Sequence, residues 1–586
     1  MPARPIPAGP RRRRGLRPVL VLLLVVVATL VFLGRLVDVQ VVHADALRAE
    51  SKDRRSQERT VPGTRGEIVD RNGVVLAGGI PVYTVSASPR LAAQAGSVHA
   101  AAARIAAALG VPEPGVERTL TKDRSSDYAV LAKSVPLAAL TRVKALQVPW
   151  LYYDESQRRV YPNGAVAGNL VGFVGSSGEA QAGIEYGENR CLQGADGTVE
   201  YESALDGTPI PGTAVTTKPA TQGGEVTLTI DRDLQWFAQQ TLAARAKQTG
   251  AKWGSVVVEE VRTGRLLAVA DWPSVDPNDV NATASTDSGS LGSRAFTAPY
   301  EPGSTMKTIT AAALLDRRLA TPASRVVAPY RWTPPGVNIA DSETHPTEHL
   351  TLTGVLVQSS NTGISRLATA MNDEVRYRYL QRFGFGTPTS VGFGAEAGGD
   401  LGGGPSRWDP QTRIATMFGQ GLTSTAVQMA SAYATLANGG VRLPVRLVSS
   451  CTTPDGQVHR TPVAAGTRIV SPAAAKGSIA MLEDVATKGW LAKDVAIPGY
   501  RVGIKTGTAQ ESDGHGGYSK QYLVSVAGVA PAESPRYVVY VDLNAPSKMN
   551  TSQAAAPVFR DVMARVLQAN GVIPSGTRSP DLPTTW

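Results

Sequence analysis

Residues 255–260 read SVVVEE, residues 265–270 read RLLAVA, and the turn sequence RTG at 262–264 separates them. Short runs of β-branched and other apolar residues on both sides of a glycine-containing turn are typical of a β-hairpin. This hairpin begins the longest part of the chain in which strand and helix signals are both clear.

A second hairpin is predicted near the far end of the chain, from residues 522–529 and 537–543. Helical patterns cover residues 234–247, with Asp231 or Asp233 as a cap and Gly250 as the end, and residues 552–569. Because strands at both ends enclose Ala-rich, helical sequence, we expect one sheet that is closed by distant segments and flanked by helices, an α+β fold.

The bulk composition indicates a multidomain globular protein. The chain has 586 residues, of which 42% are hydrophobic and 18% charged, which is too long for one ordinary core. The formal net charge is +10, but six arginines lie before residue 18. Because much of the excess belongs to this basic tail, nucleic acid is not an expected partner.

The two cysteines, Cys191 and Cys451, form no CxxC pair. They argue against a structural zinc site and against a disulfide-dense scaffold. Whether they pair with each other stays open, with two unpaired thiols as the simpler alternative. We expect neither a metal site nor a cofactor.

The apolar segment after Pro18 predicts a transmembrane helix at 19–37, in which Arg35 can reach the headgroups. The alternative is a cleaved signal peptide, with the triplet Ala44-Asp45-Ala46 as its site, but this triplet lies far beyond the apolar run. The positive-inside rule then keeps residues 1–18 in the cytoplasm as a basic tail and exports the rest. This predicts a single-pass plasma-membrane protein with an extracytoplasmic body.

Differences in charge and in hydrophobic pattern divide the exported part of the chain into four regions. Residues 38–60 form a charged linker, and residues 61–225 alternate short apolar runs with polar segments, which indicates an elongated, mixed α/β pedestal. Residues 226–572 form the second domain, and residues 573–586 are expected to be a flexible tail.

Three short motifs occur in this second domain: STMK at 304–307, SSN at 359–361 and KTG at 505–507. Each motif alone is compatible with a helix start or a polar loop. Pro302-Gly303 before the first motif and TITA after it place Ser304 in the first turn of a helix, where developing negative charge is stabilised. Lys307 shares its helical face, and a partly buried amine can act as a base toward the hydroxyl.

The other two motifs supply complementary groups. Ser359 is a candidate proton shuttle between Lys307 and a leaving amine, and Asn361 is a candidate holder of the substrate amide. Lys505, Thr506 and Thr508 suit an anionic carboxylate, and Gly507 is expected to let a substrate backbone approach. The peptide N–H groups of Ser304 and Thr508 are candidate oxyanion donors.

The three motifs in this order resemble those of penicillin-binding proteins and serine β-lactamases. Further segments are similar to class B penicillin-binding proteins, the monofunctional transpeptidases: RGEIVDRNG at 65–73, RVYPN at 159–163, AGIE at 182–185, YEPG at 300–303, GQGL at 419–422 and AYATLANGG at 432–440. The resemblance implies an antiparallel five-stranded sheet between helices, on a dimerisation-like pedestal.

The same resemblance implies acylation of Ser304 by the D-Ala-D-Ala end of a peptidoglycan stem peptide, with Lys307 as base, and capture of the acyl group by an amine. It also implies covalent inhibition by β-lactams. No segment resembles a glycosyltransferase module, so glycan polymerisation is left to a membrane-embedded partner of the division or elongation machinery. Ser360 stands at the centre of the middle motif instead of aspartate, which separates the chain from class A β-lactamases.

Three alternatives use the same motifs. A D,D-carboxypeptidase would pass the acyl group to water, a β-lactamase would hydrolyse its inhibitor, and a receptor would bind β-lactams without turnover. The acceptor that releases Ser304 is not readable from the motifs.

Overall fold

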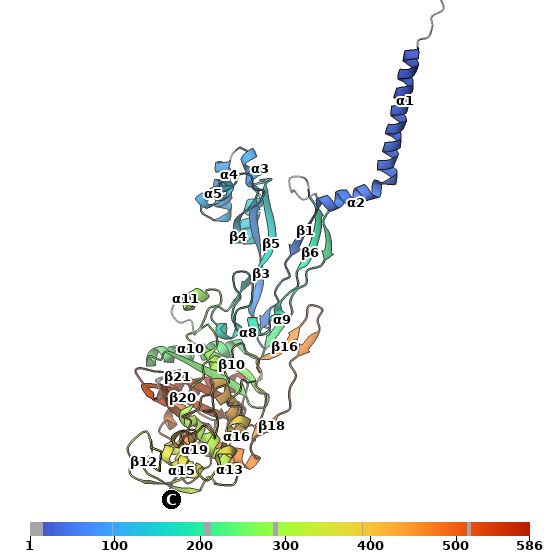
Figure 1. Ribbon diagram of the computed structural model, residues 1–586. Coiled ribbons are helices and arrows are strands. Elements are labelled where there is room, and N and C mark those ends of the chain that lie inside the picture. The colour runs from blue at the N-terminus through green and yellow to red at the C-terminus, as the bar shows by residue number, and fades with distance from the viewer. Residues whose placement is uncertain (1–15, 97, 204–211, 285–290, 390, 513–516) are drawn as a thin grey trace, which may run out of the picture.

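The computed structural model describes residues 16–96, 98–203, 212–284, 291–389, 391–512 and 517–586. Figure 1 shows a long helix at one end, an elongated middle part and a compact body at the other end. Most of the predicted basic tail 1–18 lies outside the described residues.

The N-terminal helix α1 spans Leu16–Val37 and continues into a short π-helix, Asp38–Val42. Its apolar side chains are exposed, and Figure 1 shows it standing apart from the rest of the chain. Within the described residues it is the one helix that is long and apolar enough to cross a membrane. The helix predicted at 19–37 is therefore present.

The predicted linker 38–60 contains regular structure. Helix α2 spans Ala44–Arg55, and β1, Ser56–Val61, pairs with β6, Gly197–Glu202, which in turn pairs with β7, Val215–Lys218. Strand pairing with residues far along the sequence therefore orders the end of this segment.

The pedestal is built on a seven-stranded sheet in the order β17-β16-β8-β2-β3-β4, with β5 also on β3. Its strands are β2 Ile68–Val69, β3 Val75–Ala87, β4 Ala129–Val135, β5 Leu151–Val160, β8 Glu225–Leu228, β16 Val448–Thr452 and β17 Val458–Arg460. Its helices are α3 Pro89–Gln94, α4 Val98–Leu109, α5 Glu113–Lys122, α6 Leu137–Lys144, α7 Gly168–Val171, α8 Gly183–Gly187 and α9 Asn189–Leu192. Strands β16 and β17 come from a part of the sequence that otherwise belongs to the body.

Three of the sequence segments that resemble the family meet at one buried carboxylate in the pedestal. Glu185 is fully buried and pairs with Arg65 and Arg159, each at 2.6 Å, and it accepts the Tyr161 hydroxyl at 3.2 Å. A buried charge is tolerated when it is paired and hydrogen-bonded. Glu185 therefore holds these three segments of the pedestal together.

Cys191 and Cys451 form a disulfide. Cys191 lies in α9, and Cys451 lies in β16, 260 positions later in the sequence. Unpaired thiols were the simpler expectation because this spacing carries no local signal, and only the pairing of β16 with β8 brings the two residues together.

The body contains a five-stranded antiparallel sheet in the order β10-β9-β21-β20-β19, as expected from the resemblance. Its strands are β9 Trp253–Glu260, β10 Arg265–Trp272, β19 Gly503–Ser512, β20 Tyr518–Ala530 and β21 Tyr537–Asn544. Both predicted hairpins are present, β9 with β10 and β20 with β21. Pairing of β9 with β21 closes the sheet between distant segments.

Helices cover both faces of this sheet. Helices α10 Arg232–Thr249 and α21 Ala556–Ala569 pack together on one face, and α13 Met306–Asp316, α18 Ala426–Ala437 and α19 Pro472–Lys488 lie toward the other. Asp231 caps α10 and Gly250 ends it in the left-handed conformation, as predicted.

Short elements complete the body. The helices are α11 Val280–Ala284, α12 Arg294–Thr297, α14 Leu352–Gln358, α15 Asn361–Ala368, α16 Asp373–Phe383, α17 Pro410–Ala415 and α20 Ala492–Val495, with 3-10 turns η3 Gly303–Thr305 and η4 Ser552–Ala554. The strands are β11 Arg325–Ala328, β12 Arg331–Trp332, β13 Ile339–Ala340, β14 Glu348–Thr351, β15 Val441–Arg442 and β18 Thr467–Arg468.

The segment 573–586 is not a free tail. Ser575 donates its backbone N–H to Gly499, Thr585 bridges Leu350 of β14, and the Trp586 indole donates to the Leu350 carbonyl. Its proline-rich polar composition suggested a solvated segment, but its backbone groups find partners on the surface of the body.

Candidate active site

Ser304 lies in the 3-10 turn η3, directly before α13. Gly303 has a φ of +57° and donates its N–H to Gly419 at 2.9 Å, which fixes the entry to the turn. The Tyr433 hydroxyl donates to the Thr305 carbonyl at 2.9 Å. The nucleophile candidate therefore stands at a helix start, as predicted from its flanking residues.

Lys307 is fully buried and contacts Ser304. Its Nζ atom lies 2.9 Å from Ser304 Oγ and 3.2 Å from Ser359 Oγ, and it also donates to the Ser359 carbonyl. Burial lowers the pKa of Lys307 to about 7, against the opposing effect of the Asp341 charge. Near neutral pH a large fraction of this amine is therefore unprotonated and able to accept the Ser304 proton.

Ser359 is held between two helices. It follows α14 in a left-handed conformation with φ +57°, and Ser360 caps the start of α15. The bend turns Ser359 Oγ toward Lys307 and also toward Lys505, whose Nζ lies 2.9 Å away. One hydroxyl thus connects the first and third motifs.

Lys505 is buried on β19, the edge strand of the sheet. Burial lowers its pKa well below the ordinary value, and the positive charge of Lys307 lowers it further. Lys505 also donates to the Thr506 carbonyl at 3.1 Å. An anionic group placed here would meet an amine that gains stabilisation by becoming charged.

Gly507 lies close to β20 and to the turn that carries Ser304. A Cβ atom at this position would lie 2.3 Å from Ser525 Oγ and 3.0 Å from the Pro302 carbonyl oxygen. The missing side chain therefore lets β19 pack against β20 and the nucleophile turn. Thr508 follows on the same strand, with its Oγ1 3.3 Å from Ser552 Oγ.

Asn361 is the first residue of α15, and its side-chain amide donates to the Ala340 carbonyl at 2.9 Å. Hydrogen bonds join Ser304, Lys307, Ser359 and Lys505 into one cluster. Asn361 begins the helix that follows Ser359, and Thr508 lies on the same strand as Lys505.

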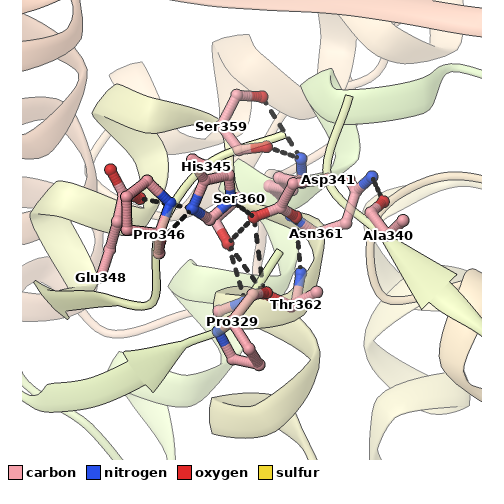
Figure 2. Close-up of polar contacts among 12 residues, drawn as sticks. Pro329, Ala340, Asp341, His345, Pro346, Glu348, Ser359, Ser360, Asn361 and Thr362 are labelled. Carbon is pink, nitrogen blue, oxygen red and sulfur yellow. Dashed lines mark hydrogen bonds and ion pairs between the residues drawn. The ribbon is translucent and has the colours of Figure 1, made fainter. Parts of the chain in front are cut away.

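Asp341 organises the middle motif and was not singled out from the sequence (Figure 2). Its carboxylate accepts the backbone N–H groups of Asn361 at 2.5 Å and Thr362 at 2.9 Å, and the Ser360 hydroxyl at 2.7 Å. A carboxylate that accepts N–H groups at a helix N-terminus is stabilised by the helix dipole as well. Asp341 thereby fixes the start of α15 and the bend at Ser359.

His345 supports Asp341 from the other side. Its Nε2 atom lies 3.0 Å from the Asp341 carboxylate, and its Nδ1 atom lies 2.7 Å from the Pro346 carbonyl (Figure 2). Burial lowers the pKa of His345, but these two hydrogen bonds and the Glu348 charge outweigh burial, so the pKa lies above its usual value. Asp341 and His345 lie in a loop that has no helix, strand or motif signal in the sequence. Their role is therefore visible only in the folded structure.

A buried lysine beside a helix-start serine, bridged by a second serine to another lysine, defines a serine acyltransferase site. The chain matches the penicillin binding protein transpeptidase domain over residues 254–564 and the penicillin-binding protein dimerisation domain over residues 60–228. It therefore belongs to the penicillin-binding proteins, and to their class B, which combines these two domains.

Similar proteins agree with this assignment. The chain is 32% identical to the penicillin-binding protein PbpB of Mycolicibacterium smegmatis, and the match covers 98% of this chain and 92% of that protein. It is also 32% identical to the peptidoglycan D,D-transpeptidase FtsI of Escherichia coli K12, and this match covers 95% of this chain and 92% of that protein. Among solved structures, penicillin-binding protein 3 of Mycobacterium tuberculosis in complex with aztreonam has a TM-score of 0.70 at 27% identity, covering 90% of this chain and all of that one. A peptidoglycan synthetase from Bifidobacterium adolescentis has a TM-score of 0.74 at 30% identity, covering 91% and 100%.

Proposed function

We propose that this protein is a peptidoglycan D,D-transpeptidase that crosslinks stem peptides through an acyl-enzyme on Ser304. The observation that carries the proposal is the 2.9 Å contact between Lys307 Nζ and Ser304 Oγ, made by an amine whose pKa burial lowers to about 7. The Escherichia coli relative that is named a peptidoglycan D,D-transpeptidase matches 95% of this chain.

In the first half-reaction Lys307 takes the Ser304 proton, and Ser304 Oγ bonds to the carbonyl carbon of the penultimate D-alanine. The peptide C–N bond then breaks. Ser359 passes a proton to the departing amine of the terminal D-alanine, since its hydroxyl contacts Lys307. Lys505, Thr506 and Thr508 bind the terminal carboxylate, and the N–H groups of Ser304 and Thr508 stabilise the oxyanion.

In the second half-reaction an amine from a neighbouring stem peptide attacks the ester. The new amide C–N bond forms, the Ser304 ester bond breaks, and the amine proton returns to Ser304 through Lys307. A β-lactam enters the first half-reaction in the same way, because its amide carbonyl takes the place of the D-alanyl carbonyl.

The decisive experiment uses two substrates. Wild-type protein should become covalently labelled by a fluorescent penicillin, and Ser304→Ala should not. With a D-Ala-D-Ala peptide and an acceptor amine, the crosslinked peptide should form. Wild-type protein that stays unlabelled contradicts the acyl-enzyme, and hydrolysis without crosslinking in the presence of acceptor identifies a carboxypeptidase.

The cellular setting follows from the anchor. Arginines before α1 favour a cytoplasmic N-terminus and an extracytoplasmic body, and a membrane-embedded glycan polymerase of the division or elongation machinery would supply the glycan strands. Protease added outside osmotically stabilised cells should remove the penicillin-labelled body if the orientation holds. Enrichment of a fluorescent fusion at midcell would place it in division, and lateral or polar signal in elongation.

A further inference from the structure

The segment Asp581–Trp586 runs across the body and reaches the start of the helix that carries Ser359. The Thr584 carbonyl accepts the Thr351 N–H at 3.0 Å, Thr585 bridges Leu350, and Trp586 donates its indole N–H to the Leu350 carbonyl at 3.1 Å. The indole also packs against His349, with 4.7 Å between ring centroids. These contacts continue the edge of β14 up to the first residue of α14.

Thr351 is the N-cap of α14, and this segment orients its hydroxyl. Thr351 Oγ1 donates to the Pro583 carbonyl at 2.6 Å and accepts the Gly354 N–H at 3.0 Å. A hydroxyl has one proton, so donation to Pro583 leaves its lone pairs for the helix. The segment therefore completes the cap that starts α14.

Gly354, one turn into α14, is packed directly against the same segment. A Cβ atom there would lie 1.8 Å from the Thr584 carbonyl oxygen. The backbone of residue 584 thus lies on the helix itself, where any larger side chain would displace it.

The other end of the segment is fixed to α19. Lys488 donates to the Leu582 carbonyl at 2.7 Å and pairs with Asp581 at 2.5 Å and Asp484 at 2.8 Å. Helix α19 packs against both α14 and β19, the strand that carries Lys505. The segment consequently connects α14, which precedes Ser359, with α19, which packs against the strand of Lys505.

We propose that Asp581–Trp586 is a positioning strap that holds α14, and with it Ser359, at the distance that Lys307 and Lys505 require. Helix α14 has seven residues, from Leu352 to Gln358, and all of them except Gln358 are buried, so a displacement at Thr351 is passed along its axis to Ser359. This inference rests on the proposed acyl transfer at Ser304.

The test compares deletion of residues 583–586 and Trp586→Ala with Thr577→Ala. Thr577 lies four residues before this segment, accepts a hydrogen bond from Arg501 at 2.7 Å, and is the matched control. The rate of Ser304 acylation by a fluorescent penicillin should fall by roughly ten- to a hundredfold in the deletion variant, because small displacements of catalytic groups are costly, and should stay within about twofold in Thr577→Ala. Trp586→Ala should lie between them.

Two further measurements distinguish a positioning role of the strap from a role in the stability of the fold alone. The rate loss should persist at temperatures well below the melting temperature of each variant, and the pH midpoint of acylation should move downward because Lys307 loses Ser359 as an acceptor. Normal acylation by the folded deletion variant, or a rate that only follows the unfolded fraction, would overturn the strap. Neither result affects the proposed transpeptidase, whose failure would appear as unlabelled wild-type protein.

Discussion

Lys307 and Lys505 share one acceptor, since Ser359 Oγ lies 3.2 Å from one amine and 2.9 Å from the other. A hydroxyl oxygen has two lone pairs, so it can accept from both amines while its own proton points away from them. That proton is then available to a leaving amine. The proposed relay at Ser359 follows from this arrangement.

Acylation of Ser304 should depend on pH with a midpoint near 7. Burial lowers the pKa of Lys307 from 10.5 to about 7, and the base must be neutral, so the rate should rise through that pH and level off above it. Measuring the second-order rate of fluorescent-penicillin labelling from about pH 5 to about pH 9 checks this. A rate that only begins to rise near the ordinary lysine pKa contradicts the assignment.

Lys307→Met should abolish most activity without loss of stability. Removal of a general base costs roughly 10²- to 10⁴-fold in rate. The buried amine resists protonation in the folded state, so its contribution to stability is unfavourable at neutral pH and improves as pH rises from about 7 toward 10.5. Calorimetry should therefore give a melting temperature for Lys307→Met at pH 7 no lower than that of the wild type.

The matched control for that variant is Lys476→Met, on the exposed side of α19. It removes a lysine without touching the cluster, and labelling should be unchanged. A melting temperature of Lys307→Met well below that of wild type would show that the amine stabilises the fold.

Asp341→Asn should weaken the middle motif. The variant replaces a charged acceptor of two backbone N–H groups and one hydroxyl, which should cost about 1–3 kcal/mol of unfolding free energy. The Asp341 charge raises the pKa of Lys307, so its removal should shift the acylation midpoint to lower pH. Denaturant titration and the pH profile test the two effects. Glu348→Gln alters the other carboxylate near His345 and should leave both nearly unchanged.

Gly507→Ala should separate β19 from the nucleophile turn. The new methyl group would overlap Ser525 Oγ and crowd the Pro302 carbonyl, so acylation should fall at least about tenfold through misplacement of Lys505 and Ser304. Adding Ser525→Ala should restore part of the rate, because it removes the nearest atom. Gly115→Ala in α5, where the space is open, should have no effect. Full activity of Gly507→Ala would contradict the packing role of this glycine.

Loss of the disulfide should lower stability and leave the chemistry intact. The bond joins two residues that are 260 positions apart, and removal of a native disulfide costs about 2–5 kcal/mol. The double variant Cys191→Ser, Cys451→Ser should melt at a lower temperature, yet label at the wild-type rate at low temperature. The wild type after mild reduction should behave in the same way.

The sequence allowed the prediction of features that have local signals. Alternating apolar runs identified β9, β10, β20 and β21, Asp231 and Gly250 marked the ends of α10, and three motifs located Ser304, Ser359 and Lys505. These signals work because strand period, capping chemistry and motif spacing are all short-range properties.

Other features depend on contacts between distant residues and had no such signal. Asp341 is an ordinary aspartate until the fold brings it to the start of α15. The pairing of Cys191 with Cys451, the inward role of Gly507 and the docking of Trp586 likewise require the assembled sheets and helices. Local composition even pointed the wrong way for residues 573–586, because proline and polar side chains say little about where backbone carbonyls find partners.

The shared sheet has a mechanical consequence. The backbone passes between pedestal and body after β8, again into β16 and once more after β17, and the disulfide adds a crosslink beside these passages. A body attached at one point would swivel, whereas one attached at several points in a row resists both twisting and tilting. Rotation of the body against the pedestal therefore has to distort the seven-stranded sheet or strain the Cys191–Cys451 crosslink.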